Sequence, residues 1–352
     1  MKTYNKIKIL TDHGDPECFK HVRKRILLKN STLSRFFLKS RVVRELIWGF
    51  KCWIISLFYS KSVPIVTYGT GHGFVFAYLQ YIFKFIFKPR THVIFDALWE
   101  KRKRKGFAGF MEKFMINTVK HVVDLCIVWG KADVVNFSNE YELPKEKFLF
   151  YHYHTTLEYF NVNPIPGKYI FAGGNSQRDY FTLIEAVKNI NYPVFIATMV
   201  EGIANMASSY PHIVVKAVTP AEFRDKMAGC SIFVECHAQG FLRTGGHQTM
   251  LNAMWLGKPV VLADENSALG YIVDGENGLV VNIGDIENLR NKINLLISDS
   301  SLCQRIAKKG QMEVQKKEYS PVNVIQYIYN TAITIHCKKL GVGYKDRHIE
   351  LY

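Results

Sequence analysis

The stretch from Gly240 to Asp285 reads GFLRTGGHQTMLNAMWLGKPVVLADENSALGYIVDGENGLVVNIGD and is the most informative part of the chain. It begins with a loop that contains glycines, and a run of helical length follows. A short apolar segment then ends in turn residues, as expected for a buried strand. This order of loop, helix and strand predicts an α/β fold, in which helices connect the parallel strands of a sheet.

The same alternation extends upstream from this stretch. Short apolar segments such as YIFAGG and THVIFDA are each followed by a helical pattern. Between Tyr151 and Lys168 the alternation is interrupted by two prolines and a run without a clear period, which indicates a linker. We therefore expect two doubly wound, Rossmann-like domains at residues 1–154 and 169–318, joined by a linker at 155–168.

The 352 residues carry a formal net charge of +16, and nearly all of it lies in the first half. Residues 1–160 hold 27 Lys and Arg against 13 Asp and Glu, whereas the remainder holds 19 against 17. The excess is concentrated in Lys20–Lys51, where bases alternate with Phe, Leu, Ile and Trp, and in Glu100–Gly106. This mixture is typical of a helix on an anionic membrane surface. The alternatives are a solvated basic face and nucleic acid; we expect no nucleic-acid partner, because no RNA- or DNA-binding motif is present.

Other features of the composition favour a cytoplasmic protein. The seven cysteines are scattered and form no CxxC pair, so we expect neither a disulfide framework nor a metal cluster. The start of the chain lacks the apolar core of a signal peptide. The best candidate for a membrane span, Leu46–Tyr59, is short and contains Lys51. We expect a protein that is peripheral at the inner face of the membrane.

The glycine loop predicts an anion site. Gly245 and Gly246 let the backbone approach a ligand closely, and the helix that follows offers free N–H groups and a positive dipole end to a phosphate. Arg243 stands beside them and can add a charge-assisted contact. The alternative is a plain tight turn into a helix. The loop lacks the lysine and the spacing of a P-loop, and it lacks the GxGxxG of a dinucleotide site.

From Leu251 onward the sequence resembles a known family. The matching residues are Ala253-Met254, Gly257-Lys258-Pro259-Val260-Val261, Asp274-Gly275, Gly278-Leu279-Val280 and Gly284-Asp285. They are similar to the nucleotide-sugar-binding half of GT-B glycosyltransferases, particularly family 4. The resemblance implies two Rossmann-like domains that face a central cleft, with a last helix, here 319–340, crossing back to the N-domain. It also implies sugar transfer from a nucleoside diphosphate-sugar without a metal or another cofactor.

The resemblance assigns roles on the donor side. Arg178 falls where the family has a lysine that neutralises the diphosphate, and Arg243 would compensate for a second basic position that is Asn175 or missing here. The alternative for Arg178 is a surface ion pair with Asp179 or a neighbour. The family's acidic pair is replaced by Thr244 and by Asn252, which would hold the ribose. The other donor-side predictions are Gly173, Gly174, Lys216, Gly245, Gly246, Gln248 and Thr249, with His247 among the catalytic residues.

The N-domain of such proteins binds the acceptor. The loop after the first strand contains Asp12, His13, Gly14 and Asp15, and a second loop contains Thr70, Gly71 and His72. The second loop would hold an acceptor phosphate, or else it is a structural turn. Asp96 ends a predicted strand near the place where many relatives keep a catalytic histidine, so it would act as a general base. The alternative is a helix N-cap.

These observations predict a glycosyltransferase of the hexosyltransferase class. It would transfer a sugar from a nucleoside diphosphate-sugar to a lipid-linked or membrane-proximal glycan. One alternative is an enzyme of the nucleotide-sugar epimerase type, which would consume the donor without an acceptor. The other is a catalytically degenerate GT-B binding subunit, which the replaced acidic pair favours and the retained glycines oppose.

Overall fold

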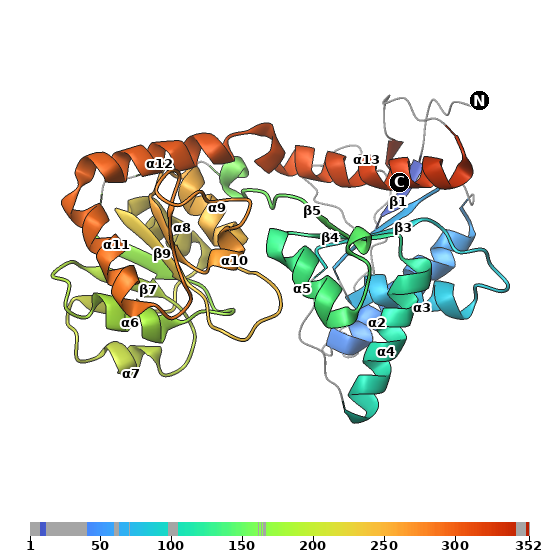
Figure 1. The fold of residues 1–352 in the computed structure, drawn as a ribbon, viewed down its shortest axis with the longest axis horizontal. Helices are drawn as coiled ribbons and strands as arrows, with labels where there is room; N and C mark the ends of the chain where they lie inside the picture. The colour runs from blue at the N-terminus through green and yellow to red at the C-terminus, as the bar shows by residue number, and fades with distance from the viewer. Residues whose placement is uncertain are drawn as a thin grey trace. The chain divides into compact units, whose positions relative to one another are not determined.

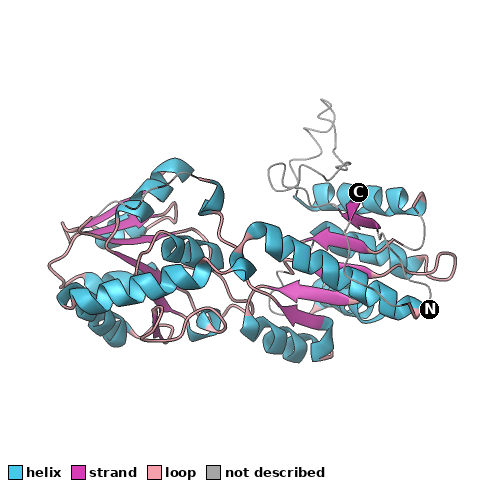
Figure 2. Cartoon of the chain, turned by 90° about the horizontal axis from the view of Figure 1, so that it is seen from above, coloured by secondary structure: helices cyan, strands magenta, loops and turns pink. Residues whose placement is uncertain are grey.

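The computed structural model describes residues 8–11, 41–59, 63–69, 71–97, 105–160, 162, 164, 167–342 and 350–351. The chain forms two compact units. Unit 1 consists of Met1–Val128, Asp133–Tyr151 and Ile325–Tyr352, and unit 2 of Trp129–Ala132 and His152–Val324. Each unit contains a parallel sheet with helices packed on it (Figures 1 and 2). This confirms the predicted α/β class.

Unit 1 has a parallel sheet whose strands follow the order β12-β1-β2-β3-β4-β5. Its strands are β1 (Lys8–Thr11), β2 (Ile65–Tyr68), β3 (His92–Phe95), β4 (Leu125–Val128), β5 (Phe148–Phe150) and β12 (Glu350–Leu351). The helices between them are α2 (Arg41–Leu57), α3 (Gly71–Ile82), α4 (Gly106–Val122) and α5 (Lys131–Tyr141), and the 3₁₀ turn η1 (Lys145–Lys147) precedes β5. Strands β3 and β4 are buried throughout, as expected for central parallel strands.

Unit 2 has a second parallel sheet, with the order β11-β10-β9-β6-β7-β8. Its strands are β6 (Ile170–Gly173), β7 (Val194–Ala197), β8 (Ile213–Lys216), β9 (Ile232–Cys236), β10 (Val260–Ala263) and β11 (Leu279–Val281). Its helices are α6 (Tyr180–Val187), α7 (Ile203–Ala207), α8 (Pro220–Gly229), α9 (His247–Trp255), α10 (Glu265–Ala268), α11 (Ile286–Ser298) and α12 (Ser300–Val314), with 3₁₀ turns η2 (Leu157–Tyr159) and η3 (Lys317–Tyr319).

The strand order of unit 2 reverses between β6 and β9. The chain runs outward from β6 through β7 to β8, then returns so that β9 pairs with the other edge of β6. Ile170 and Phe171 of β6 pair with Ile232 and Phe233 of β9. In open parallel sheets a ligand binds outside the carboxyl ends of the strands at such a reversal. The loops after β6 and β9 therefore form the first place to look for a site.

Short polar residues determine where several helices of unit 2 begin. Thr219 and Glu222 form a reciprocal capping box at the start of α8, with Pro220 at the first helical position. Asp285 and Asp299 accept backbone N–H groups at the starts of α11 and α12. These caps satisfy amides that have no partner within their helices.

The last long helix, α13 (Pro321–Leu340), belongs to both units. Its first residues, up to Val324, lie in unit 2, and the rest, from Ile325, lies in unit 1. In unit 1 its His336 is hydrogen-bonded through Nδ1 to Thr91 Oγ1 at 2.9 Å. No helix in the part of the chain that the structure describes is long and apolar enough to cross a membrane.

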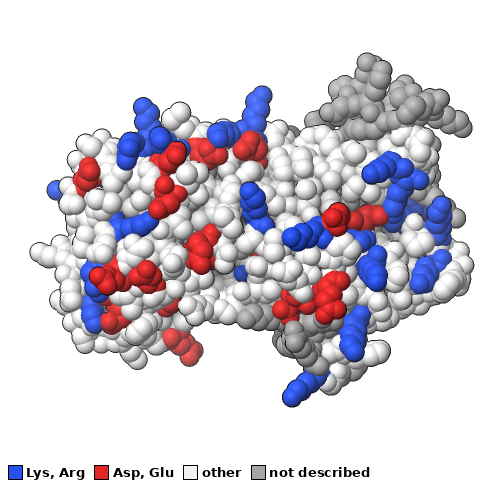
Figure 3. Space-filling model, in the orientation of Figure 1, with Lys and Arg blue, Asp and Glu red and all other residues white. Residues whose placement is uncertain are grey.

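The charged side chains are distributed unevenly over the surface. In the view of Figure 3, Lys and Arg are spread over most of unit 1, where Asp and Glu are gathered in two groups. Over unit 2 the two signs are interspersed. This pattern agrees with the composition, in which the basic excess belongs to the first half of the chain.

Candidate functional site

Three loops at the carboxyl ends of strands meet in unit 2. The loop after β6 contains Gly174–Arg178, the loop after β9 contains His237–Gly246, and Asp264 follows β10. The antiparallel bridge between Arg178 and His237 joins the first two loops directly. The predicted glycine loop thus lies at the reversal of the strand order, next to the loop that carries Arg178.

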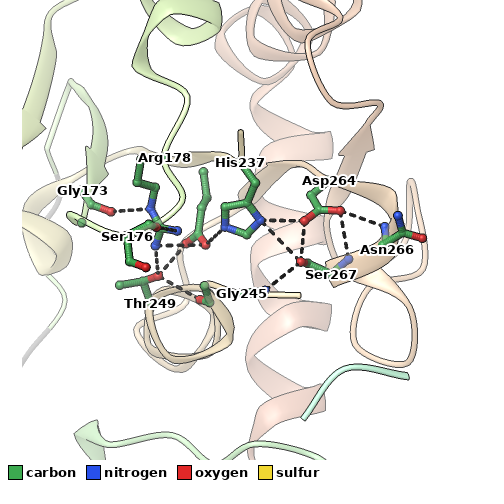
Figure 4. Close-up of polar contacts among 12 residues, drawn as sticks. Gly173, Ser176, Arg178, His237, Gly245, Thr249, Asp264, Asn266 and Ser267 are labelled. Carbon is green, nitrogen blue, oxygen red and sulfur yellow. Dashed lines mark hydrogen bonds and ion pairs between the residues drawn. The ribbon is translucent and has the colours of Figure 1, made fainter. Parts of the chain in front are cut away.

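A buried chain of charged side chains connects these loops. Arg178 Nη2 lies 3.2 Å from Glu235 Oε1, which lies 2.6 Å from His237 Nε2. On the other side of the ring, His237 Nδ1 lies 2.8 Å from Asp264 Oδ2. The exposed fractions of the four side chains range from 0% to 8%. Figure 4 shows Arg178, His237 and Asp264 in line across the three loops.

The geometry determines the protonation state of His237. Both of its ring nitrogens face carboxylate oxygens, which only accept hydrogen bonds, so both nitrogens must carry a proton. Burial alone lowers the pKa of His237, but the hydrogen bonds to Asp264 and Glu235 outweigh burial and raise this pKa above its ordinary value. The two carboxylates therefore favour the imidazolium form of His237.

The two carboxylates respond in the opposite direction. Burial alone raises the pKa of Glu235, but the charge of Arg178 and the contact with His237 lower it below its ordinary value. Burial likewise opposes ionisation of Asp264, and the hydrogen bond from His237 lowers its pKa. Two cations and two anions thus alternate in the interior. Such a chain is stable only as a complete set, because removing one member leaves a buried charge without a partner.

The ionic chain holds the glycine loop and the first turn of α9. Ser267 Oγ donates to Asp264 Oδ2 at 2.5 Å and accepts the amide of Gly245 at 3.2 Å. Thr249 Oγ1 donates to Glu235 Oε2 at 2.6 Å. These contacts are drawn in Figure 4. They position the backbone at the start of α9, which is the group predicted to bind an anion.

Gly246 shows why the loop needs glycine. Its φ of 72° lies in the left-handed region, and a Cβ there would lie 1.5 Å from Glu235 Oε1. Gly246 is also the N-cap of α9, so no cap side chain covers the first amides of this helix. Free N–H groups at a helix start attract anions. The backbone at Gly246–Thr249 is therefore both tightly fixed and suited to a phosphate.

Arg178 lies in this site, but its guanidinium already forms hydrogen bonds and an ion pair with other residues of the protein. Besides Glu235, it donates to Gly173 O at 3.1 Å, Ser176 O at 3.2 Å and Thr249 Oγ1 at 3.0 Å. The alternative of a surface ion pair with Asp179 is wrong, because the pair is buried and its carboxylate is Glu235. Asp179 instead accepts Thr182 N at the start of α6. A role of Arg178 toward a diphosphate stays a prediction.

The other residues predicted after β6 are held by neighbouring backbone. Asn175 Oδ1 accepts Met199 N at 2.7 Å and Thr198 Oγ1 at 3.1 Å. Gly174 has a φ of 123°, and a Cβ there would lie 2.9 Å from Arg178 Nε. Lys216 is not brought to this site, because β8 is an edge strand and β7 and β6 separate it from β9. Its charge lies near Glu222 of α8 instead.

Asn252 is bound to the segment that leads into unit 2. Its Oδ1 accepts Thr155 Oγ1 at 3.0 Å and Thr156 N at 2.9 Å, and its Nδ2 donates to Thr156 Oγ1 at 2.8 Å. Gln248 Nε2 also donates to Thr156 Oγ1, at 3.2 Å. The polar face of α9 thus anchors residues 155–156. The predicted contact of Asn252 with a ribose stays a prediction.

His247 is a buried, neutral side chain. Burial, together with the nearby charge of His237, lowers the pKa of His247 to about 4. Its ring packs on Tyr271, with the ring centroids 4.7 Å apart, and among the described residues its Nε2 has no hydrogen-bond partner. Of the neighbouring predicted residues, Thr244 is buried and Arg243 is half-buried. The catalytic assignments of His247 and Arg243 stay predictions.

The residues predicted in the N-domain are only partly described. Asp12, His13, Gly14, Asp15 and Thr70 lie outside the described residues, as does the side chain of His72, while Gly71 is the first residue of α3. Asp96 follows β3 and is buried, with a φ of 58° that is uncommon outside glycine. In the described part of the chain the next helix is α4, whose N-cap is Lys105, so the alternative of a helix cap finds no support there.

Sequence reasoning missed Glu235, His237, Asp264 and Ser267. A signal was present, because Glu235 stands within an otherwise apolar strand and Asp264 directly follows another. A charged residue in a central parallel strand is expensive to bury unless it is paired. The presence of Glu235 in this strand therefore indicated that a charged partner must lie nearby. Which residue that partner is depends on the order of the strands.

Known proteins are similar to this chain in sequence and in structure. Residues 245–313 match the family described as Glycosyl transferases group 1. The capsular polysaccharide biosynthesis glycosyltransferase CapM of Staphylococcus aureus is 30% identical over 123 residues, which are 34% of this chain and 30% of CapM. The lipopolysaccharide core biosynthesis glycosyltransferase LpsE of Rhizobium meliloti (strain 1021) is 35% identical over 74 residues, or 20% of this chain and 22% of LpsE. This chain therefore matches less than a third of the length of either relative.

The structural match covers almost the whole chain. The crystal structure of Anabaena Alr3699/HepE in complex with UDP has a TM-score of 0.66 and 16% identity, and the match covers 94% of this chain and 100% of HepE. The same protein has been solved with UDP and glucose and with UDP-glucose. At this identity the likeness concerns the fold, and it confirms the predicted GT-B architecture.

Proposed function

We propose that this chain, which has the GT-B fold and at residues 245–313 belongs to the group 1 glycosyltransferases, transfers a sugar from a nucleoside diphosphate-sugar to an acceptor hydroxyl. The observation that carries the proposal is the glycine loop at the start of α9. It lies at the reversal of the strand order in unit 2, and its backbone is fixed by the buried ionic chain. The group 1 match begins at Gly245, in the same loop.

We propose a uridine diphosphate donor. HepE, which shares the fold, forms complexes with UDP and with UDP-glucose. In this chain the diphosphate would accept hydrogen bonds from the amides of Gly246–Thr249 at the free start of α9. Arg243, half-buried in the same loop, would add a charge-assisted contact.

The ionic chain supports this site by positioning it. The charges of Arg178 and His237 are balanced by Glu235 and Asp264, so the four residues add little net positive charge. Their function would be to hold the amides of the glycine loop in the orientation that a departing diphosphate needs. Donors fixed before the reaction stabilise developing charge without a cost of reorganisation. Because the site would act through amides and Arg243, the proposal requires no metal.

Transfer forms a bond between the acceptor oxygen and the anomeric carbon, while the bond from that carbon to the diphosphate breaks. The diphosphate leaves with the electron pair and the added negative charge, and the acceptor hydroxyl loses its proton. We propose Asp96 as the base for an inverting reaction. Its burial and its left-handed backbone conformation favour a constrained, functional role over that of a surface residue. In a retaining reaction a donor phosphate oxygen would take the proton instead.

We propose a lipid-linked or membrane-proximal glycan as the acceptor, used at the cytoplasmic face of a membrane. The basic excess of residues 1–160 favours an anionic surface as partner. The names of the two curated relatives point to the same substrates, since one acts in capsular polysaccharide biosynthesis and the other in lipopolysaccharide core biosynthesis.

The test is calorimetric titration of the full chain with UDP and GDP in the presence of a chelator. We expect saturable binding of UDP, weakened about tenfold or more by Arg243→Ala, since a charge-assisted hydrogen bond contributes roughly 1.5–3 kcal/mol and each 1.4 kcal/mol is about tenfold in affinity. Arg305→Ala is the matched control, because Arg305 is exposed on α12 within the same family segment. Release of UDP from UDP-glucose would then be measured with and without a lipid extract as acceptor source.

Each result decides between the candidate functions. Acceptor-dependent release of UDP supports the transferase. Consumption of the donor without any acceptor would instead indicate an epimerase-type enzyme. Binding without turnover would indicate a degenerate binding subunit, and a folded protein that binds no nucleotide would refute the donor site itself.

A further inference from the structure

One face of unit 1 combines exposed apolar side chains with basic ones. Between residues 46 and 95 the sequence contains no Asp or Glu but five Lys and Arg. The same stretch provides many of the large apolar side chains that remain exposed in the described part of unit 1. Most of these side chains come from α2 and the residue after it, and from the end of α3 and the turn that follows.

The α2 part is a strip along the outer face of the helix. Leu46, Ile47 and Phe50 are large apolar side chains that are exposed to water. Neighbouring apolar side chains left exposed in this way often mark a site of interaction. Together with Lys51, Ile54 and Ile55 they line an apolar groove of about 600 Å³. Cys52 and Trp53 of α2 belong to a core cluster with Ile65 and Phe76, and Ile54 and Ile55 pack against this cluster. The exposed Leu46, Ile47 and Phe50 lie outside the cluster.

The α3 part is a short turn with the sequence Lys-Phe-Ile-Phe-Lys at residues 84–88. The exposed fractions are 90% for Phe85 and 72% for Ile86. Lys84 lies over the rings of Tyr81 and Phe85, at 4.2 and 5.1 Å from their centroids. Two large apolar side chains at the tip of a turn, flanked by lysines, suit insertion into a lipid interface better than exposure to water.

Contacts between the two parts make them a single surface. Trp53 of α2 stacks on Phe83 at 4.9 Å and meets Phe87 edge-on at 6.0 Å, between ring centroids. Arg90 Nη2 donates to Ser56 O at 2.6 Å and to Tyr59 O at 2.5 Å, which fixes the end of the turn to the end of α2. We use the name α2–α3 surface for the exposed residues Leu46, Ile47, Phe50, Phe58, Ile82, Phe85 and Ile86.

We propose that the α2–α3 surface docks onto a phospholipid bilayer that contains anionic lipids. The apolar tips would enter the interface, and Lys51, Lys84 and Lys88 would contact the lipid headgroups. Insertion of side chains would be combined with charge attraction, and a peripheral protein needs both for stable anchoring. The proposal deepens the proposed function, because it rests on the membrane-proximal acceptor and assigns that membrane a contact surface.

Nucleic acid fits this surface less well. Phosphate contacts need polar donors at the exposed positions, and base stacking needs aromatic faces. Here Ile47, Ile82 and Ile86 share the exposed positions with the phenylalanines, and aliphatic side chains offer neither contact. A bilayer interface accepts both kinds of side chain.

The test is co-sedimentation of the full chain with vesicles of phosphatidylcholine alone or with added phosphatidylglycerol. The variant is Phe85→Ser with Ile86→Ser, and the matched control is Phe181→Ser, since Phe181 is 56% exposed on α6 of unit 2. We expect the double variant to lower partition into anionic vesicles by about tenfold or more, because two exposed apolar side chains lose their transfer into the interface. The control should bind like the wild type.

A charge variant and a nucleotide titration complete the design. Lys84→Gln with Lys88→Gln should remove much of the preference for phosphatidylglycerol. UDP titration of the same proteins without vesicles separates the two proposals, since lost vesicle binding with intact UDP binding concerns only the α2–α3 surface.

Three outcomes would overturn the docking proposal. The first is a wild-type protein that does not bind anionic vesicles, and the second is a Phe85 and Ile86 double variant that binds them unchanged. The third is binding to a labelled mixed-sequence RNA that is as tight as binding to vesicles and is weakened by the same double variant.

Discussion

The left-handed glycine at residue 246 connects the backbone of the candidate site to its buried charges. A Cβ at this position would overlap Glu235 Oε1, at 1.5 Å, and His237 Nε2, at 2.5 Å. Neither atom can move far, because both belong to the ionic chain of Arg178, Glu235, His237 and Asp264. The glycine loop can therefore lie this close to the ionic chain only because residue 246 has no side chain.

We expect Gly246→Ala to lower the free energy of unfolding by at least ~3 kcal/mol, because left-handed strain is combined with overpacking. Gly202→Ala is the matched control. Gly202 is also a left-handed N-cap, with a φ of 82°, but a Cβ there meets nothing within 4 Å. The control should cost only the strain, roughly 1–2 kcal/mol. Equal losses for the two variants in urea unfolding would contradict the packing argument.

The charge of His237 gives the stability a characteristic pH dependence. The folded protein raises the pKa of His237 above its unfolded value of about 6.5. The contribution of His237 is therefore complete below about pH 6.5 and is lost as the pH rises through the raised folded value. Glu235 and Asp264 act in the opposite sense: their folded pKa values are lowered, so their contribution is lost on acidification through those values.

We expect the free energy of unfolding of the wild type to fall as the pH rises above about 6.5, and to fall less in His237→Gln. Nuclear magnetic resonance titration of the histidine rings is the direct measurement. The His237 ring should lose its proton at a pH above 6.5, while the His247 ring should stay neutral down to about pH 4. A His237 ring that loses its proton at or below its ordinary pKa would contradict the assigned imidazolium.

At the scale of elements, helix α9 makes two kinds of contact at different positions along its length. Its first turn provides the amides of the glycine loop, and one turn later Asn252 binds Thr155 and Thr156. Thr155 is fully buried, so its hydroxyl group depends on Asn252 for an acceptor. A movement of residues 155–156 would therefore act directly on the helix that carries the candidate anion site.

We expect Thr155→Val and Asn252→Ala each to cost roughly 1–3 kcal/mol, because each leaves a buried polar partner unsatisfied. The double variant should cost less than the sum, with a coupling of at least about 0.5 kcal/mol. Ser298→Ala, which removes an exposed hydroxyl bonded to Leu295 O, should stay within about 0.5 kcal/mol of the wild type. Strict additivity in the double-mutant cycle would show that the two side chains act independently.

At the scale of the whole molecule, the candidate sites are divided between the two units. Unit 2 contains the candidate donor site, and unit 1 carries the α2–α3 surface and Asp96. The charge is divided in the same way, with the basic excess in the first half of the chain. This division lets the proposed donor binding and the proposed membrane docking be measured separately in the intact protein.

We expect UDP to slow amide hydrogen exchange in peptides that cover residues 240–252 of unit 2. At about 100 times the dissociation constant, binding stabilises the competent state by about 2.7 kcal/mol, so amides that exchange by local opening should slow by up to about 100-fold. Peptides from β2 and α3 in unit 1 serve as the internal control and should change little. Protection confined to unit 1 would move the nucleotide site away from the glycine loop.

The fold was predictable from the sequence because its signals are local. Most apolar strands are followed by a helical pattern, and the strands of four or five residues match the apolar runs. The two-residue strand β12 near the end of the chain was not predicted. The loop at Gly245 and Gly246 was also predictable, since a glycine pair before a helix is a local pattern. The strand order β9-β6-β7 was not, because the apolar runs are similar and each can pair with several others.

The sequence by itself thus determined the alternation of strands and helices, the glycine loop, the placement of charge and the resemblance to GT-B glycosyltransferases. Only the tertiary structure decided which polar groups meet. Arg178 and Glu235, or Asn252 and Thr155, are distant in the chain and become neighbours through the order of the strands and the packing of α9. Burial then decided their chemistry, because removal from water makes each charge depend on its partner: His237 becomes a cation between two carboxylates, whereas His247 stays neutral.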